Sequence, residues 1–324
     1  MKSTQTDEAL VHAGAETNSF FNQTVEGLSA SPRRLSCKFF YDDAGAQLFQ
    51  RICDLPEYYI TRSELQILRL QGKDIAATLG DRIELIGLGT GAGTKTQILL
   101  QELDHPVVYM PIDISREQLE NSSARFRKIF PDLSIFPICA DYLEPFDLPL
   151  PRPPSSRSVI YFPGSTIGNF EPRMAAQFLA RLAELVGHDG GLLIGVDLQK
   201  DPAVIESAYN DSAGVTAAFN LNLLNRANRE LGADFAVENW RHDAIYNRTE
   251  GRIEMYLVST AQQTVHIGEH AFAFAKGERI VTEYSYKHTP DAFNALARAA
   301  GFRFQRLWTD RDKLFGLFYF TVAS

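Results

Sequence analysis

Residues 83–94 read IELIGLGTGAGT, and this stretch decides the fold. A short apolar segment runs directly into a turn with glycine at positions 89, 91 and 93, and the helical stretch Thr94 to Leu103 follows. At such a junction the backbone N–H groups of the helix start can face a ligand, and glycine lacks the Cβ that would block its approach. The stretch therefore predicts a ligand-binding turn between a strand and a helix.

The same alternation of strands and helices continues after this turn. Further apolar segments lie at 107–113, 133–138, 158–164 and 191–198. Helical spacing is found between them, at Ser115 to Ile129 and at Ala175 to Val186. Strands that are apolar almost throughout and are separated by helices are typical of a parallel sheet covered on both faces. The predicted fold class is therefore α/β, with a Rossmann-like sheet.

The pattern changes after Lys200. Residues 213–232 are typical of a helix, and 241–268 read as antiparallel strands joined by turns. A helix at Asp291 to Ala300 and a closing hairpin then return to the first sheet. We therefore predict a Rossmann-like domain at 63–198 plus 287–324 and a second α+β lobe at 1–62 plus 199–286.

Two local features complete this prediction. Thr61 followed by Glu64 has the spacing of a capping box at a helix start. The polar residues from Met1 to about Asn18 predict a loosely docked N-terminus.

Composition excludes several classes of protein. The 324 residues carry 32 Lys+Arg against 40 Asp+Glu, a formal net charge of −8, and no basic block suited to nucleic acid. The three cysteines at 37, 53 and 139 form no CxxC pair, which favours a reducing cytoplasm and no metal site. We find no signal peptide and no apolar run long enough for a membrane span. We expect a cytoplasmic protein that is a monomer.

Two acidic positions identify the class of ligand. Asp113 ends the segment after the glycine turn, where a carboxylate can accept hydrogen bonds from ribose hydroxyls. Asp141 and Tyr142 follow the next segment, where an acid and an aromatic ring suit an adenine amine and its ring. The predicted ligand contains adenosine and has no need of phosphates. S-adenosylmethionine is therefore favoured over NAD.

Seven stretches are longer and more unusual than the glycine turn. They are FYDDAGAQLFQRICDLPEYYITRSE (40–64), GTGAGTKT (89–96), PIDIS (111–115), FPGSTIGNFEP (162–172), DLQKDPAVIESAYNDSAGVTAAFN (197–220), RIEMYL (252–257) and TEYSYK (282–287). In this order the chain resembles the ergothioneine-pathway histidine Nα-methyltransferases, from about Leu35 onwards. The resemblance implies S-adenosylmethionine-dependent trimethylation of the α-amine of L-histidine to hercynine.

The resemblance also implies the site residues. S-adenosylmethionine would be held by Gly89, Lys95, Asp113, Asp141 and Tyr142. The amino-acid substrate would be held by Tyr58, Asn169, Tyr209, Glu283 and Ser285, with Tyr41 as a further contact. In the family, the positions of Asn169 and Tyr209 meet the carboxylate of histidine. The positions of Glu283 and Ser285 meet its imidazole.

Elementary chemistry is compatible with these roles. A neutral imidazole has one donor and one acceptor nitrogen, and a carboxylate and a hydroxyl two residues apart on one strand face, as at Glu283 and Ser285, can bind both. Carboxylate recognition by Asn and Tyr rather than Arg predicts no additional fixed cation near the substrate amine, which must lose its proton before it attacks. In-line methyl transfer requires alignment and a dry pocket, so we expect neither a covalent nucleophile nor a metal.

One position departs from the family pattern. The residue two before the first glycine of the turn is usually acidic, whereas this chain has Gly87, with Glu84 three residues earlier. Either a cofactor contact is lost and binding is weakened, or a local bulge brings Glu84 into a substitute role.

Other functions remain open from the sequence. The acceptor of the same fold could be another aromatic amino acid or a thiohistidine, although an indole has only a donor and would leave Ser285 unused. A protein that binds S-adenosylmethionine without turnover is a second alternative, and a nicotinamide-dependent oxidoreductase is a third. Products of incubation with histidine, tryptophan and thiohistidine, and a test of hydride transfer with NADH, would separate them.

Overall fold

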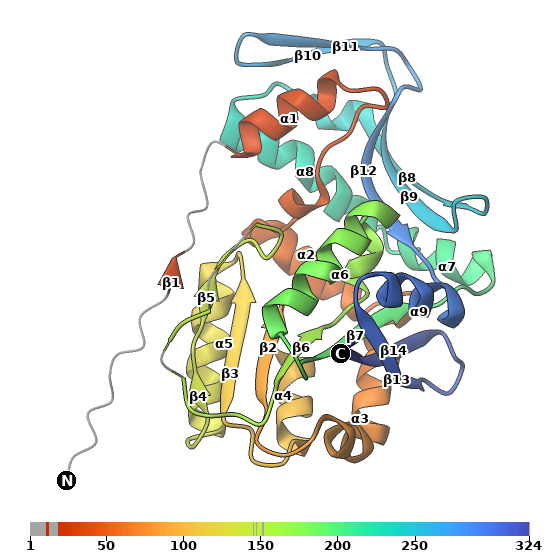
Figure 1. Ribbon diagram of the computed structural model, residues 1–324. Coiled ribbons are helices and arrows are strands. Elements are labelled where there is room, and N and C mark those ends of the chain that lie inside the picture. Colours follow the sequence, from red (N-terminus) through yellow and green to blue (C-terminus); the bar gives the residue numbers. More distant parts are fainter. Residues whose placement is uncertain (1–10, 13–18, 145, 147, 151, 324) are drawn as a thin grey trace.

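The computed structural model describes residues 11–12, 19–144, 146, 148–150 and 152–323 (Figure 1). Apart from Val11 and His12, the predicted loosely docked segment Met1 to Asn18 lies outside these residues. No helix in the described ranges is long and apolar enough to cross a membrane.

A nine-stranded sheet forms the centre of the described part of the chain. Its strands are β1 (Val11–His12), β2 (Glu84–Leu88), β3 (Val108–Asp113), β4 (Ser134–Ile135), β5 (Ile138–Cys139), β6 (Ser158–Phe162), β7 (Gly191–Asp197), β13 (Phe302–Thr309) and β14 (Phe315–Val322). Their order is β1-β5-β3-β2-β6-β7-β14-β13, with β4 also paired to β3. Strand β14 runs antiparallel to β7 and to β13, and the other pairs are parallel. The α/β class and the returning C-terminal hairpin are thus confirmed.

Helices cover both faces of this sheet (Figure 1). Helices α3 (Tyr59–Leu79), α4 (Thr94–Glu102) and α5 (Arg116–Ile129) share a hydrophobic core with one face. Helices α6 (Pro172–Val186) and α9 (Pro290–Ala299) pack against the other face. Successive strand residues point to opposite faces, so both must be apolar: Tyr109 enters the first core and Met110 the second.

A second, three-stranded antiparallel sheet lies beside the first (Figure 1). It contains β8 (Trp240–Asn247), β9 (Arg252–Ser259) and β12 (Arg279–Tyr286), and the hairpin β10 (Gln263–Ile267) and β11 (His270–Phe274) extends from it. The remaining helices are α1 (Ser19–Ser29), η1 (Cys37–Phe40), α2 (Asp43–Cys53), η2 (Thr166–Asn169), α7 (Pro202–Tyr209), α8 (Val215–Leu231) and η3 (Val237–Asn239). One hydrophobic core contains Phe40, Leu68, Leu223 and Leu317, and so includes residues of both predicted domains. The division into two domains stays a prediction.

The chain order places the glycine turn where the winding of the sheet reverses. Strand β2 pairs with β3 on one side and with β6 on the other, so the direction of winding reverses at β2. In open parallel sheets, ligands bind outside the carboxyl ends of the strands at such a reversal. Gly89 follows β2 at that end of the sheet.

The predicted capping box is wrong. Helix α3 already begins at Tyr59, so Thr61 lies inside its first turn. The fully buried carboxylate of Glu64 instead accepts hydrogen bonds from Lys95 and from the backbone N–H of Gly164. A buried carboxylate requires charged or backbone donors close to it, and here the first turn of α4 and the loop after β6 provide them.

Candidate active site

The turn after β2 requires glycine at its first position. Gly89 has a left-handed φ of 57°, and a Cβ at this position would lie 3.4 Å from the ring of Tyr142. Its N–H donates to the carbonyl of Ile112, the penultimate residue of β3, at 2.9 Å. The residue itself is exposed. A ligand can therefore approach the backbone of this turn closely.

Asp113, the last residue of β3, is oriented by backbone donors. One carboxylate oxygen accepts from the N–H of Gly91 and the other from the N–H of Ser115, each at 3.0 Å. Burial raises the pKa of Asp113, while these backbone donors act in the opposite direction. Each carboxylate oxygen has a second lone pair, so Asp113 can still accept from two hydroxyls of a ligand.

Asp141 and Tyr142 follow β5 and flank the same turn. One oxygen of Asp141 accepts from the N–H of Leu143 at 2.9 Å, and the other lies 3.4 Å from the ammonium of Lys38. The ring of Tyr142 packs edge-on against Phe162, with 5.6 Å between centroids. An acid and a flat ring beside an open glycine turn have the chemistry to hold an adenosine. The ion pair with Lys38 was missed by sequence reasoning.

Lys95 forms an ion pair in the first turn of α4. Its Nζ lies 2.6 Å from Oε2 of Glu64, whose side chain is fully buried. Glu64 also accepts from the hydroxyl of Tyr161 at 3.0 Å and from the N–H of Gly164 at 2.9 Å. An ammonium has three N–H donors, so the pair still allows Lys95 to bind a ligand carboxylate.

The structure answers the question raised by Gly87. A Cβ at this position would lie 2.5 Å from Cγ2 of Thr90, so an acidic side chain has no room. Glu84 lies at the opposite end of β2, where it accepts from Ser158 at 3.0 Å and pairs with Arg152 at 3.1 Å. The register of β2 with β3 and β6 is continuous. The proposed bulge that would bring Glu84 to the turn is therefore wrong, and the buried acid next to Lys95 is Glu64.

Glu283 and Ser285 project from β12. The pairing of β12 with β9 shifts between Val281 and Glu283, and a β-bulge of this kind re-aims the side chains that follow. Tyr284 lies on the other face, where the guanidinium of Arg252 stacks 3.7 Å from its ring centroid. The alternation of a strand therefore puts Glu283 and Ser285 on a common face, as predicted from their spacing.

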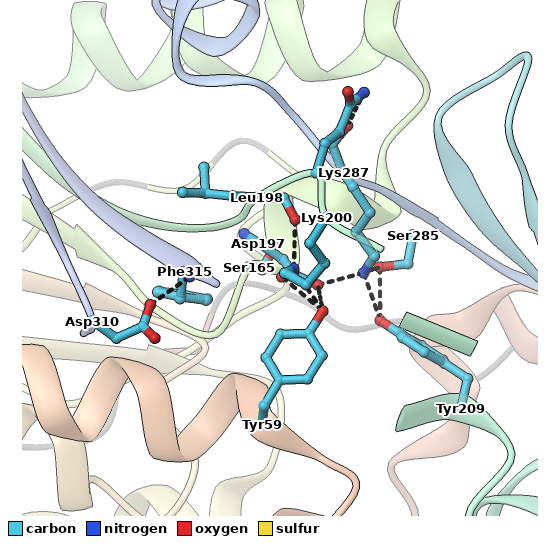
Figure 2. A network of polar contacts seen from close by, with 11 residues as sticks. Tyr59, Ser165, Asp197, Leu198, Lys200, Tyr209, Ser285, Lys287, Asp310 and Phe315 are labelled. Atoms are coloured by element: carbon cyan, nitrogen blue, oxygen red, sulfur yellow. Dashed lines mark hydrogen bonds and ion pairs between the residues drawn. The ribbon is translucent and has the colours of Figure 1, made fainter. Parts of the chain in front are cut away.

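Tyr209, the last residue of α7, contacts this face directly. Its hydroxyl lies 2.9 Å from Oγ of Ser285. The Nζ of Lys287 lies 2.9 Å from the hydroxyl of Tyr209, 2.8 Å from Oγ of Ser285 and 2.9 Å from Oδ2 of Asp197 (Figure 2). The expectation that the site holds no additional fixed cation is therefore wrong. The signal was present in TEYSYK, because Lys287 continues the alternation of Glu283 and Ser285.

A second lysine meets the same carboxylate. Asp197 ends β7 and accepts from the hydroxyl of Tyr59 at 2.9 Å and from Lys200 (Figure 2). Burial alone would raise the pKa of Asp197, but the ammonium groups of Lys287 and Lys200 lower it below its ordinary value. Burial lowers the pKa of Lys200 to about 8. Two ammonium groups around one carboxylate leave a net positive charge that favours an anionic ligand group.

The pKa of Glu283 is shifted in the opposite direction to that of Asp197. Burial raises its pKa to about 7, and the nearby ammonium of Lys287 opposes that shift. A carboxyl group with this pKa is able to hold or release a proton near neutral pH.

The remaining predicted substrate residues surround this face. Tyr58 precedes α3 and is buried, whereas Tyr41 follows η1 and is 39% exposed. Both rings meet Phe49 edge-on, with centroids 6.2 Å and 5.5 Å away. Asn169 ends η2, which lies against β12: a Cβ on Gly168 would be 2.8 Å from the carbonyl oxygen of Tyr286. Glu283 acts electrostatically on the hydroxyls of Tyr41 and Tyr58, so these two residues lie near Glu283, while Asn169 lies near β12.

Consecutive residues after β6 connect the two predicted residue sets. Gly164 donates its N–H to Glu64, the partner of Lys95, and Oγ of Ser165 accepts from the N–H of Asp197 at 2.9 Å. The thiol of Cys37 lies within electrostatic range of both Glu283 and Tyr142. The set around the glycine turn and the set around β12 therefore lie near one another.

The donor set fits S-adenosylmethionine. The open turn at Gly89 allows a ligand atom to approach closely, and the oriented carboxylate of Asp113 can bind ribose hydroxyls. The ring of Tyr142 can bind a purine, and the ammonium of Lys95 can bind a carboxylate. No group of three or more His, Cys, Asp or Glu side chains in the described ranges is arranged to hold a metal ion.

Comparison with known proteins gives a family. The model of the histidine-specific, SAM-dependent methyltransferases matches residues 20–322. The chain is 40% identical over 296 residues to histidine N-alpha-methyltransferases of Mycolicibacterium smegmatis and of Mycobacterium tuberculosis, covering 90% of this chain and 91% of each relative. It is 33% identical to ergothioneine biosynthesis protein 1 of Neurospora crassa, covering 86% of this chain and 32% of that protein. The chain therefore belongs to the family of histidine-specific, SAM-dependent methyltransferases.

Proposed function

We propose that this protein transfers methyl groups from S-adenosylmethionine to the α-amine of L-histidine, up to three times, and so forms hercynine. The observation that carries the proposal is that Tyr209 lies beside both Ser285 and Glu283 and is joined through Lys287 to Asp197, which ends β7 at the same end of the central sheet as the glycine turn. A carboxyl and a hydroxyl on one strand face match the two nitrogens of an imidazole. The 40% identity to histidine N-alpha-methyltransferases supports the same substrate.

On the cofactor side, the residues divide by chemistry. Asp113 accepts from the ribose hydroxyls, Asp141 accepts from the adenine amine, and Tyr142 flanks the ring beside Gly89. The ammonium of Lys95 binds the carboxylate of the methionine part. When bound, S-adenosylmethionine supplies a methyl group on a positively charged sulfur.

On the substrate side, charge sets the orientation. The carboxylate of histidine lies at Asn169 and Tyr209, where the ammonium of Lys287 behind the Tyr209 hydroxyl attracts an anion. The ring lies at Glu283 and Ser285, because an ionised Glu283 would repel the substrate carboxylate. The α-amine then lies between these contacts and faces the glycine turn.

The chemical step needs alignment more than acid–base machinery. The lone pair of the neutral α-amine forms an N–C bond to the methyl carbon while the S–C bond breaks, and the amine releases one proton to solvent before each of the three attacks. No side chain forms a covalent bond. Tyr41 lies near both Glu283 and Tyr142, and Tyr58 lies near Tyr41 and Tyr209. Both rings therefore border the space between the imidazole contacts and the glycine turn, where an aromatic face stabilises the growing methylammonium.

Mass spectrometry tests this function. Incubation of histidine with the purified protein and S-adenosylmethionine is expected to add one, two and then three methyl groups. Parallel incubations with tryptophan and a thiohistidine test the alternative acceptors, and faster methylation of either would overturn histidine as the substrate. Binding of S-adenosylmethionine with no product from any acceptor would leave a binding protein.

The organisation of the enzyme is part of the proposal. We assign cofactor binding to 63–198 plus 287–324 and substrate binding to 1–62 plus 199–286, in a monomeric cytoplasmic enzyme. Sedimentation of the purified protein tests the monomer. Family membership as a SAM-dependent methyltransferase gives the nicotinamide alternative no support.

A further inference from the structure

The ammonium of Lys287 is completely enclosed. Its side chain has 0% exposure, as does that of Asp197. Its Nζ has three acceptors at hydrogen-bond distance: Oδ2 of Asp197 at 2.9 Å, the hydroxyl of Tyr209 at 2.9 Å and Oγ of Ser285 at 2.8 Å. An ammonium has three N–H groups, so these partners use all of them. Lys287 therefore acts on a substrate through the two hydroxyls in front of it (Figure 2).

Hydrogen counting restricts what these hydroxyls can do. Each has one hydrogen and two lone pairs, and Lys287 occupies a lone pair on each oxygen. Lys287 bonds to both oxygens and so holds the two hydroxyls 2.9 Å from each other, where one donates to the other. The hydroxyl that donates keeps a free lone pair, and the hydroxyl that accepts keeps a free hydrogen. Tyr209 and Ser285 thus present one outward donor and one outward acceptor, and they cannot both donate.

We propose that Lys287 is a positioning residue that couples Tyr209 and Ser285 in this way, so that Ser285 accepts a hydrogen bond from the ring N–H when Tyr209 donates to the substrate carboxylate. This inference rests on the proposed function, because it takes histidine as the ligand. Tyr209 is the hydroxyl assigned to the carboxylate, and a carboxylate has no hydrogen to give, so the direction of the pair is set once it binds.

The coupling has a consequence for the proton count. If one ring nitrogen donates to Ser285, the other nitrogen meets Glu283. If Glu283 is ionised, that second nitrogen must carry a hydrogen, and the ring is an imidazolium. If that nitrogen carries no hydrogen, Glu283 must be protonated to donate to it. In both cases the bound state has one proton more than a neutral imidazole and an ionised Glu283 have together.

Other titratable groups lie near Glu283, and their protonation could also change when a ligand binds. The thiol of Cys37, the hydroxyls of Tyr41, Tyr58 and Tyr209, and the ammonium of Lys287 lie within its electrostatic range. Burial keeps the pKa values of the Cys37 thiol and of the tyrosines above their ordinary values, so these groups stay protonated near neutral pH. Lys200, with a pKa lowered to about 8, is the neighbour of the cluster that can titrate in the same range.

Titration calorimetry in buffers of different ionisation enthalpy measures the proton count. The probe is hercynine, whose trimethylated amine cannot titrate, added to the enzyme saturated with S-adenosylhomocysteine. At about pH 8 free imidazole, with a pKa of about 6.5, is neutral and Glu283 is largely ionised, so we expect uptake of about one proton per ligand. Glu283→Gln is the matched control, because its amide can donate to the ring nitrogen without a proton from solvent. Glu283→Gln keeps Lys200, so any proton uptake that comes from Lys200 occurs in both proteins and cancels in the comparison.

The outcomes separate this inference from the proposed function. The coupling is supported if the wild type takes up about one more proton per ligand than Glu283→Gln does. Binding with equal proton uptake in the two proteins would overturn the coupling and leave the proposed function standing, whereas no binding of hercynine or of histidine would overturn both.

Removal of the ammonium tests the role of Lys287 itself. In Lys287→Met, Asp197 keeps Lys200 and Tyr59 as partners, whereas the two hydroxyls lose the ammonium that holds their oxygens together. The oxygens can then move apart, and each hydroxyl can turn its hydrogen to the ligand. We expect hercynine to bind at least tenfold more weakly, with the proton uptake reduced to the level of Glu283→Gln. Weaker binding with unchanged uptake would show a merely structural role. Should this variant not fold, the comparison of wild type with Glu283→Gln still decides the coupling.

Discussion

The ammonium of Lys287 lies 2.9 Å from the carboxylate of Asp197, and neither side chain is exposed. Asp197 ends β7 of the central sheet, and Lys287 follows the end of β12 in the three-stranded sheet. The pair therefore fixes the substrate-facing strand to the sheet that bears the glycine turn. Because both charges are buried, loss of one partner is expected to be costly. Loss of Lys287 is the less costly of the two, because Asp197 keeps the second ammonium at Lys200.

Replacement of Glu283 should affect histidine far more than S-adenosylmethionine. Glu283→Ala removes a hydrogen bond that involves a charged group, worth about 1.5–3 kcal/mol, so the KM for histidine should rise about tenfold to a hundredfold. Steady-state kinetics with each substrate varied in turn measures the difference. An equal rise in both KM values would contradict the placement of Glu283 at the imidazole.

Replacement of Asp113 should weaken cofactor binding. Asp113→Asn keeps the shape but removes the charge and one acceptor, and we expect affinity for S-adenosylhomocysteine to fall about tenfold or more. Calorimetric titration measures this affinity. Asp132→Asn, at an exposed position, is the matched control and should bind normally. Unchanged affinity in Asp113→Asn would exclude a ribose contact.

A Cβ at position 87 should destabilise the fold. Gly87→Ala would bring the new methyl group 2.5 Å from Cγ2 of Thr90, and overpacking of this kind costs about 1–3 kcal/mol. Urea denaturation measures the free energy of unfolding. The double variant Gly87→Ala with Thr90→Ser lacks the clashing methyl group and should recover much of the loss. If the double variant is no more stable, Thr90 is not the obstacle.

Loss of the buried acid beside Lys95 should also destabilise the protein. Glu64→Gln leaves the amine of Lys95 and the N–H of Gly164 without the carboxylate they contact, and we expect a loss of about 3 kcal/mol. Glu184→Gln, on the exposed side of α6, is the control and should change stability little. Equal stabilities of the two variants in urea would show that the Glu64 ion pair contributes nothing.

The raised pKa of Glu283 predicts a pH dependence of stability in the ligand-free protein. Between its ordinary pKa of 4.5 and its folded value of about 7, the folded protein holds a proton that the unfolded chain has released. The free energy of unfolding should therefore fall as pH rises through this range, relative to Glu283→Gln, which cannot titrate. Urea denaturation of both proteins at about pH 5 and about pH 8 tests the sign. A constant difference between them would show that the pKa of Glu283 is not raised.

The sequence by itself determined the fold class and was the basis of the predicted site. Alternation of apolar strands and helices indicated the sheet, because each face of a buried parallel strand must be apolar. The glycine turn, Asp113 and the order of seven stretches indicated a family and a ligand, because those features lie within single elements or follow chain order. The common face of Glu283 and Ser285 followed from the two-residue period of a strand.

Only the tertiary structure decided which charges meet. Glu64 looked like a helix cap and instead pairs with Lys95, while Glu84 lies at the far end of β2 from the turn it was considered for. The spacing of TEYSYK could have placed Lys287 on the substrate face, but its partner Asp197 lies on another sheet. Contacts between elements depend on how strands and helices pack, and residue spacing along one element carries no information about that packing.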